Sequence, residues 1–178
     1  MQLFKGGEHF LTFGSALHEV FLENIKTTFK TLSRPDKNKI VAMVNALNAH
    51  PVVRSLMKDS IREQKIYGHL FGCYLALILD AKQPKLNRGF DLKTTMCKTK
   101  KDFEAKVVEN GYVKQGLIYK KVTKLKDFYF VAICKEPPHP IFIIDMKDYK
   151  KEEKYAEQEL KFLTYFYNKY GNINQLAA

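Results

Sequence analysis

The chain has 178 residues, a formal net charge of +11 at pH 7 and 46% hydrophobic residues. These values fit one folded domain spanning residues 1–178 and exclude a disordered chain. The positive charge favours a polyanionic partner, nucleic acid more than an anionic membrane surface. The sequence has no secretory signal and no apolar stretch of membrane-spanning length. Its three widely spaced cysteines indicate reduced thiols, so we expect a cytoplasmic protein without membrane contact.

The first 58 residues are predicted to be mainly helical. A first helix is expected to begin at Ser15, which is a suitable N-cap residue. At 100° per residue, one face of that helix would direct His18 inward with three apolar residues, Leu22, Ile25 and Phe29. A second helix is expected over residues 35–58, interrupted at the sequence NAHP, where Pro51 can restart it.

The remainder alternates between predicted strands and helices. The aromatic and branched stretch IYGHLFGCYLALILD has room for two strands, and FDLKT predicts a short returning strand. Helices are expected over residues 99–110 and from residue 112, followed by the strands DFYFVAICKE and PIFIIDM. The last helix, residues 149–170, has an apolar face with Leu160, Leu163, Phe166 and Tyr167. This order predicts an α/β (α+β) domain with a central mixed sheet flanked by helices.

Two acids lie on neighbouring predicted strands. Asp80 ends one strand and Asp91 lies on the next, so their carboxylates can converge if the strands pair. Converging carboxylates need a cation between them, and oxygen ligands suit Mg²⁺ or Mn²⁺. Lys93 shares the face of Asp91, where its ammonium could orient a water or stabilise charge on a phosphate. An Asp, an Asp-x-Lys and a metal ion form a minimal set for hydrolysing a phosphodiester.

Simpler structural interpretations exist for the same residues. Asp-x-Lys triplets are common on exposed strands, where the ion pair is weak. A single inward histidine such as His18 is more often a core residue than a ligand. Gln115 and Tyr119 alone would be an ordinary helix face.

The joint order of five motifs resembles the PD-(D/E)XK nucleases, in particular the RecB-like branch that contains the exonuclease VIII (RecE) domain of prophages. FGSALHEVFLE resembles the opening helix of this branch, and IREQKIYG offers an acid, Glu63. Asp80 precedes FDLKTT at a similar spacing, and GYVKQGLIY resembles the family's Gln/Tyr helix. The late stretch FVAICKEPPHPIFI is similar to the strand–Pro-Pro–strand ending.

The resemblance implies roles for these residues. Metal ligands would be His18, Glu63, Asp80 and Asp91, with Lys93 as the catalytic lysine. Gln115 and Tyr119 would support the site or contact the DNA backbone. Two departures are clear: Leu79 stands where the family has proline, and three cysteines cannot hold the iron–sulfur cluster of some relatives.

The lysine-rich stretch after Asp91 fits binding of a phosphate backbone, through Lys98, Lys100 and Lys101. A solvated helix start explains these lysines equally well.

The resemblance implies a Mg²⁺- or Mn²⁺-dependent 5′→3′ exonuclease on linear double-stranded DNA in recombination, bacterial or phage-encoded. Its expected partners are a single-strand annealing protein and further copies of itself as a homo-oligomer. A restriction- or repair-type endonuclease and a non-catalytic DNA-binding module are the alternatives.

Overall fold

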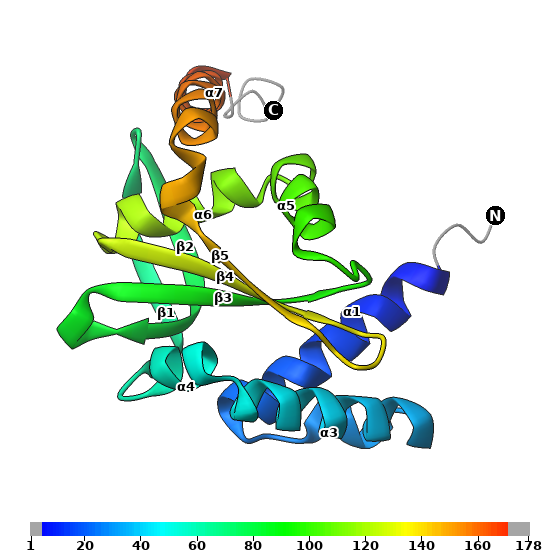
Figure 1. Cartoon of the computed structure of the whole chain (residues 1–178). Coiled ribbons are helices and arrows are strands. Elements are labelled where there is room, and N and C mark those ends of the chain that lie inside the picture. The colour runs from blue at the N-terminus through cyan, green and yellow to red at the C-terminus, as the bar shows by residue number, and fades with distance from the viewer. Residues whose placement is uncertain (1–4, 171–178) are drawn as a thin grey trace.

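The computed structural model describes residues 5–170, with side chains from residue 12 onward. Figure 1 shows one sheet with helices on both faces. The helices are α1 (Lys5–His18), α2 (Thr27–Thr31), α3 (Arg34–Ala49), α4 (Pro51–Met57), α5 (Lys100–Glu109), α6 (Tyr112–Thr123) and α7 (Lys150–Tyr170). The strands are β1 (Ile61–Leu70), β2 (Cys73–Gln83), β3 (Arg88–Thr95), β4 (Asp127–Cys134) and β5 (Ile141–Asp145). The predicted mixed sheet flanked by helices is confirmed.

The five strands lie in the order of the sequence, β1-β2-β3-β4-β5. All neighbouring pairs are antiparallel except β3 and β4, which are parallel. A parallel pair needs a long crossover connection, and α5 with α6 provides it. β2 and β3 pair only between Ala81–Gln83 and Arg88–Phe90. The two strands therefore separate on the side where Asp80 and Asp91 lie.

Successive side chains of each strand point to opposite faces of the sheet, so the core has two layers. On one face of the sheet, Phe90, Leu92, Val131 and Ile133 pack with the buried residues of α1, α3 and α4. On the other face, Phe128 and Phe130 pack against α5, α6 and α7. Figure 1 shows α1, α3 and α4 below the sheet and α5, α6 and α7 above it. The period of two places Asp91 and Lys93 on the α6 side of β3, as predicted.

The N-terminal helix differs from the prediction. α1 already begins at Lys5 and runs through Ser15, so the expected N-cap at Ser15 is wrong. After His18 the chain forms a π-helical turn (Glu19–Glu23), and Asn24 then adopts a left-handed conformation with φ 57°. Ile25 is consequently 45% exposed and does not share a helix face with His18. Local propensity could not show this break, because it depends on how residues 19–28 pack.

The boundaries of most other predicted elements agree closely with the structure, but β1 begins at Ile61, before the predicted stretch IYGHLFGCYLALILD, and includes Glu63. The expected interruption of the second helix is the junction between α3 and α4, with Pro51 at the start of α4. The end of α7 differs in its surroundings: Leu163, Phe166 and Tyr167 are 51%, 43% and 69% exposed and do not join the core. Within residues 5–170, no helix is long and apolar enough to cross a membrane.

Candidate metal-binding and catalytic site

Three side chains from three separate elements meet where β2 and β3 separate. They are His18 from α1, Glu63 from β1 and Asp80 from β2, and one potential ligand atom of each lies within 4.8 Å of the others. His18 Nδ1 is 3.6 Å from Asp80 Oδ2 and 3.9 Å from Glu63 Oε1. The group lies beside a cleft of about 490 Å³ that His18, Glu63 and Lys93 help to line.

The backbone of Leu92 fixes both His18 and Asp80. His18 Nε2 lies 2.9 Å from the Leu92 carbonyl oxygen, which can only accept a hydrogen bond. Nε2 therefore carries the proton, and in neutral His18 the lone pair is on Nδ1, facing the two carboxylates. The Leu92 N–H in turn donates to Asp80 Oδ2 at 2.6 Å. This bond uses an amide that the separated strands leave without a ladder partner.

Glu63 has an unusual backbone for a strand residue. Its φ is +47°, in the left-handed region, which costs about 1–3 kcal/mol for a residue other than glycine. Its Oε1 is buried and has no hydrogen-bond partner. A buried acceptor without a donor is unfavourable unless a cation occupies the site. The sequence motif did not define where Glu63 lies relative to the sheet. In the structure Glu63 lies beside His18 and Asp80.

The charges of this group are strongly coupled. Burial would lower the pKa of His18, but Glu63, Asp80 and Asp91 outweigh burial and raise it to about 9. Burial and the neighbouring Asp91 raise the pKa of Asp80 to about 7. The protonated imidazole therefore balances the carboxylates near neutral pH. Neutral His18 and ionised Glu63 and Asp80 would form a set of one nitrogen and several oxygen donors, which fits a divalent metal ion.

Asp91 lies outside the group of three and has partners of its own. The Lys93 ammonium is 2.7 Å from Asp91 Oδ2, and Gln115 Nε2 donates to Oδ1 at 2.9 Å. Burial raises the pKa of Asp91, although the attraction of Lys93 opposes this. Lys93 also lies over the Tyr112 ring, 4.8 Å from its centre, so its ammonium is held from two sides.

Two side chains of α6 support this ion pair. Gln115 and Tyr119 are one helical turn apart, and Gln115 Nε2 lies 3.4 Å from the Tyr119 hydroxyl. That hydroxyl donates to the carbonyl of Ile78 on β2 at 2.7 Å. Burial and Asp91 raise the pKa of Tyr119 to about 12, so the phenol stays a donor. Tyr119 is buried, and its contacts are those of a residue that positions Gln115 and β2.

The predicted site residues therefore fall into two sets. Seven of them come together: His18, Glu63, Asp80, Asp91, Lys93, Gln115 and Tyr119. The three lysines, Lys98, Lys100 and Lys101, lie on the exposed segment that follows β3, and Lys100 is 3.6 Å from Glu104. The motif pattern contained Tyr112 but gave no sign of its contact with Lys93. The backbone role of Leu92 had no sequence signal, because every residue presents the same amide and carbonyl.

Comparison with known proteins identifies the family and a similar fold. Residues 8–171 match the family model of a PDDEXK-like domain of unknown function (DUF3799). No curated protein matches the chain. The crystal structure of the protein named "Putative exonuclease" from Eubacterium rectale has a similar fold, with a TM-score of 0.71 and 18% identity. That match covers 94% of this chain and 70% of the other. Because the family model spans nearly the whole sequence, the chain belongs to the PDDEXK-like domain family.

Proposed function

We propose that the chain is a divalent-metal-dependent deoxyribonuclease that hydrolyses phosphodiester bonds. The observation that supports this most directly is the clustering of His18, Glu63 and Asp80 next to the ion pair of Asp91 and Lys93. Glu63 has a left-handed backbone, and its buried Oε1 has no hydrogen-bond partner, because His18 Nδ1 lies 3.9 Å away. Both features are understandable if the site is built to hold a cation.

The metal would be held by His18 Nδ1 and by carboxylate oxygens of Glu63 and Asp80, with Asp91 as the further ligand implied by the motif. When bound, Mg²⁺ or Mn²⁺ would polarise the scissile phosphate and lower the pKa of a bound water. The chain itself contributes the preorganisation. Leu92 holds His18 in the tautomer that presents Nδ1, so no proton has to move between the ring nitrogens before His18 can act as a ligand.

Lys93 is proposed as the catalytic cation. Its side chain is 20% exposed at the cleft, and its ammonium is held by Asp91 and the Tyr112 ring. A fixed ammonium next to the scissile phosphate can donate to a non-bridging oxygen or orient the attacking water. Gln115 is proposed to position Asp91, and Tyr119 to position Gln115. None of these roles requires sequence-specific contact with bases.

For the substrate, we propose linear double-stranded DNA, degraded by a RecE-type 5′→3′ exonuclease that works with a single-strand annealing partner in recombination. The motif order and the net charge of +11 support this proposal. The protein of similar structure from Eubacterium rectale is named an exonuclease. At 18% sequence identity, its similarity to this chain is one of fold. Lys98, Lys100 and Lys101 would bind the backbone beside the cleavage point.

The test uses one plasmid in two topologies, covalently closed and linearised with labelled ends. With Mg²⁺ or Mn²⁺, the linear form should be degraded progressively from its 5′ ends, and the closed circle should survive. EDTA should stop the reaction. Discrete fragments or nicking of the closed circle would favour the endonuclease alternative. Absence of cleavage with both metals would favour the DNA-binding module.

Two variants sharpen this test. Asp91→Asn should abolish cleavage while the protein still folds, as measured by circular dichroism. A triple substitution to Gln at Lys98, Lys100 and Lys101 should flatten the salt dependence of cleavage and shorten each run of cuts. The matched control changes three exposed lysines at the opposite end of β3, Lys85, Lys124 and Lys126. If the control has the same effect, the lysines after β3 have no special role.

A further inference from the structure

One face of α7 continues from a groove onto an exposed aromatic surface. Its side chains recur at spacings of three or four residues, which places them on one stripe of the helix. The N-terminal half of the stripe contains Glu152, Tyr155 and Glu159, and the C-terminal half contains Phe162, Phe166 and Tyr170. A helix of 21 residues is long enough for both halves to contact a partner helix.

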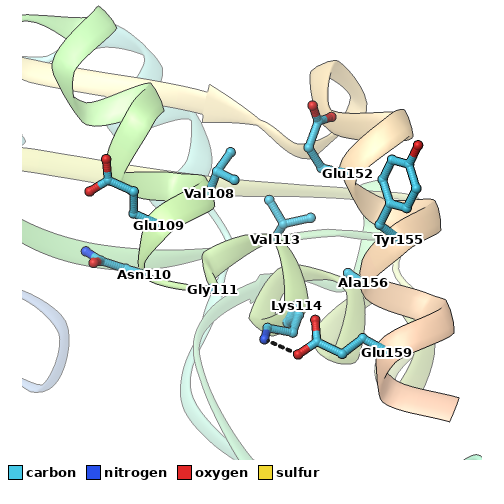
Figure 2. Close-up of a pocket in the computed structure, with 10 residues that line it drawn as sticks. All are labelled: Val108, Glu109, Asn110, Gly111, Val113, Lys114, Glu152, Tyr155, Ala156 and Glu159. Carbon is cyan, nitrogen blue, oxygen red and sulfur yellow. Dashed lines mark hydrogen bonds and ion pairs between the residues drawn. The ribbon is translucent and has the colours of Figure 1, made fainter. Parts of the chain in front are cut away.

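The N-terminal half lines a groove between α7 and the junction of α5 and α6. Figure 2 shows this groove, which has a volume of about 530 Å³. Its apolar lining includes Val108, Val113, Tyr155 and Ala156. Three acids lie around it: Glu109, Glu152 and Glu159, of which Glu159 pairs with Lys114 at 2.7 Å. An apolar groove with an acidic rim fits an aromatic segment that carries positive charge.

The C-terminal half of the stripe has those properties. Phe162, Phe166 and Tyr170 are 61%, 43% and 43% exposed. The ring centroids of Phe162 and Phe166 are 4.5 Å apart, and those of Phe166 and Tyr170 are 5.5 Å apart. Residues 160–170 contain no acid, and Lys169 lies beside the rings of Tyr165 and Tyr170. The other lysine, Lys161, pairs with Glu157 at 2.9 Å, so Lys169 provides the positive charge of this half. Contiguous apolar surface of this kind on a monomer usually marks an interaction site.

We propose that α7 mediates a two-fold homodimer in which two α7 helices pair antiparallel. An antiparallel arrangement centred near residue 161 places Phe166 of one copy opposite Ala156 of the other. The same register brings Lys169 toward Glu152, and symmetry repeats both contacts. Each aromatic half would then fill the groove of its partner, and each basic end would meet an acidic rim. Charges beside an apolar stripe are known to set helix orientation in this way.

A single DNA strand is a less suitable occupant of this surface. Exposed aromatic rings can stack on bases, and Lys169 could contact a phosphate. However, the stripe continues into Glu152 and Glu159, and the acid Glu109 lies across the groove. These carboxylates would repel a backbone that followed the helix. The second copy is complementary along the whole stripe, whereas DNA is complementary along half of it.

The first experiment measures the mass of the full chain in solution by light scattering and sedimentation across a concentration series. The wild type should form dimers, and Phe166→Glu should raise the dissociation constant at least about tenfold, because a charge would be placed in an aromatic contact. Tyr67→Glu is the matched control: Tyr67 is 62% exposed on β1 and should leave the dimer unchanged. A wild type that is monomeric at every concentration would overturn the proposal.

A charge swap tests the antiparallel register. Lys169→Glu and Glu152→Lys should each weaken the dimer by about two- to fivefold, and the double variant should restore it. Failure of the double variant to recover would reject this register and orientation. Binding of labelled single-stranded DNA should be the same for wild type and Phe166→Glu. If Phe166→Glu instead loses DNA binding while the mass is unchanged, α7 is a nucleic-acid surface and the dimer proposal is wrong.

Discussion

Replacement of Asp80 by Asn removes one charge from the proposed metal site and leaves its shape almost unchanged. In the wild type, burial and the nearby Asp91 raise the pKa of Asp80 to about 7. The amide oxygen of Asn can still accept the hydrogen bond that Leu92 N–H donates to Asp80 Oδ2. We therefore expect the variant to fold, and to be more stable than the wild type in the absence of metal above pH 7.

The size of the stabilisation follows from the pKa. A tenfold change in proton affinity is about 1.4 kcal/mol, so a rise from 3.8 to about 7 corresponds to roughly 4 kcal/mol against the ionised carboxylate. The attraction of His18, whose Nδ1 is 3.6 Å from Asp80 Oδ2, is already included in this pKa, but the buried asparagine amide must itself leave water, and this offsets part of the gain. We expect a net increase of about 1–2 kcal/mol, or roughly 2–8 °C in melting temperature at pH 8.

The assay is thermal unfolding at pH 8 in EDTA, Mg²⁺ or Mn²⁺, followed by cleavage of linear DNA. A ligand at a hundred times its dissociation constant stabilises the folded state by about 2.7 kcal/mol, so metal should raise the wild-type melting temperature clearly. Asp80→Asn should lose that increase, and its cleavage rate should fall at least about 100-fold. An exposed acid away from the site supplies the control, since Asp59→Asn should change neither property.

The reasoning would be refuted by the opposite pattern. If Asp80→Asn melts below the wild type in EDTA and gains as much stability from metal, Asp80 is a structural residue. The hydrogen bond to Leu92 would then require a carboxylate rather than an amide.

Three further predictions concern the same site. His18→Ala should weaken metal-induced stabilisation and raise the Mg²⁺ concentration needed for cleavage. If His18 is only a core residue, the variant should instead be less stable, and its folded fraction should show unchanged metal dependence. A metal titration separates these outcomes. Lys93→Met should lower the unfolding free energy by about 2–3 kcal/mol, because Asp91 loses an ammonium 2.7 Å away. Single-turnover assays at saturating Mn²⁺ should show cleavage lost and metal binding retained. The metal-free protein should melt at progressively lower temperature as pH rises from about 6 to 9. Up to about pH 7 the loss includes ionisation of Asp80, whose pKa is raised from 3.8 to about 7, and from about 6.5 to 9 it follows deprotonation of His18, whose pKa is raised to about 9. Metal should reduce this loss, and a flat pH profile in EDTA would contradict the assigned coupling.

The order of the elements and two pairs of neighbouring site residues could be predicted from the sequence alone. The period of two in β3 requires Asp91 and Lys93 to share a face, and they form an ion pair. One helical turn separates Gln115 from Tyr119, and they are in contact on α6. These are local relations, fixed by backbone geometry over a few residues. For that reason they could be read without knowledge of the rest of the chain.

The way in which the site residues come together depends on tertiary contacts that no local pattern predicts. The separation of β2 from β3 frees the Leu92 amide for Asp80, and the Leu92 carbonyl sets the tautomer of His18. The left-handed backbone of Glu63 has no sequence signal, since glutamate does not favour that conformation. The same holds for α7, where Phe166 follows the apolar helical period and yet is 43% exposed. Periodicity shows that a face is apolar, but whether that face packs within the chain or remains free for a partner depends on where the sheet and its helices end.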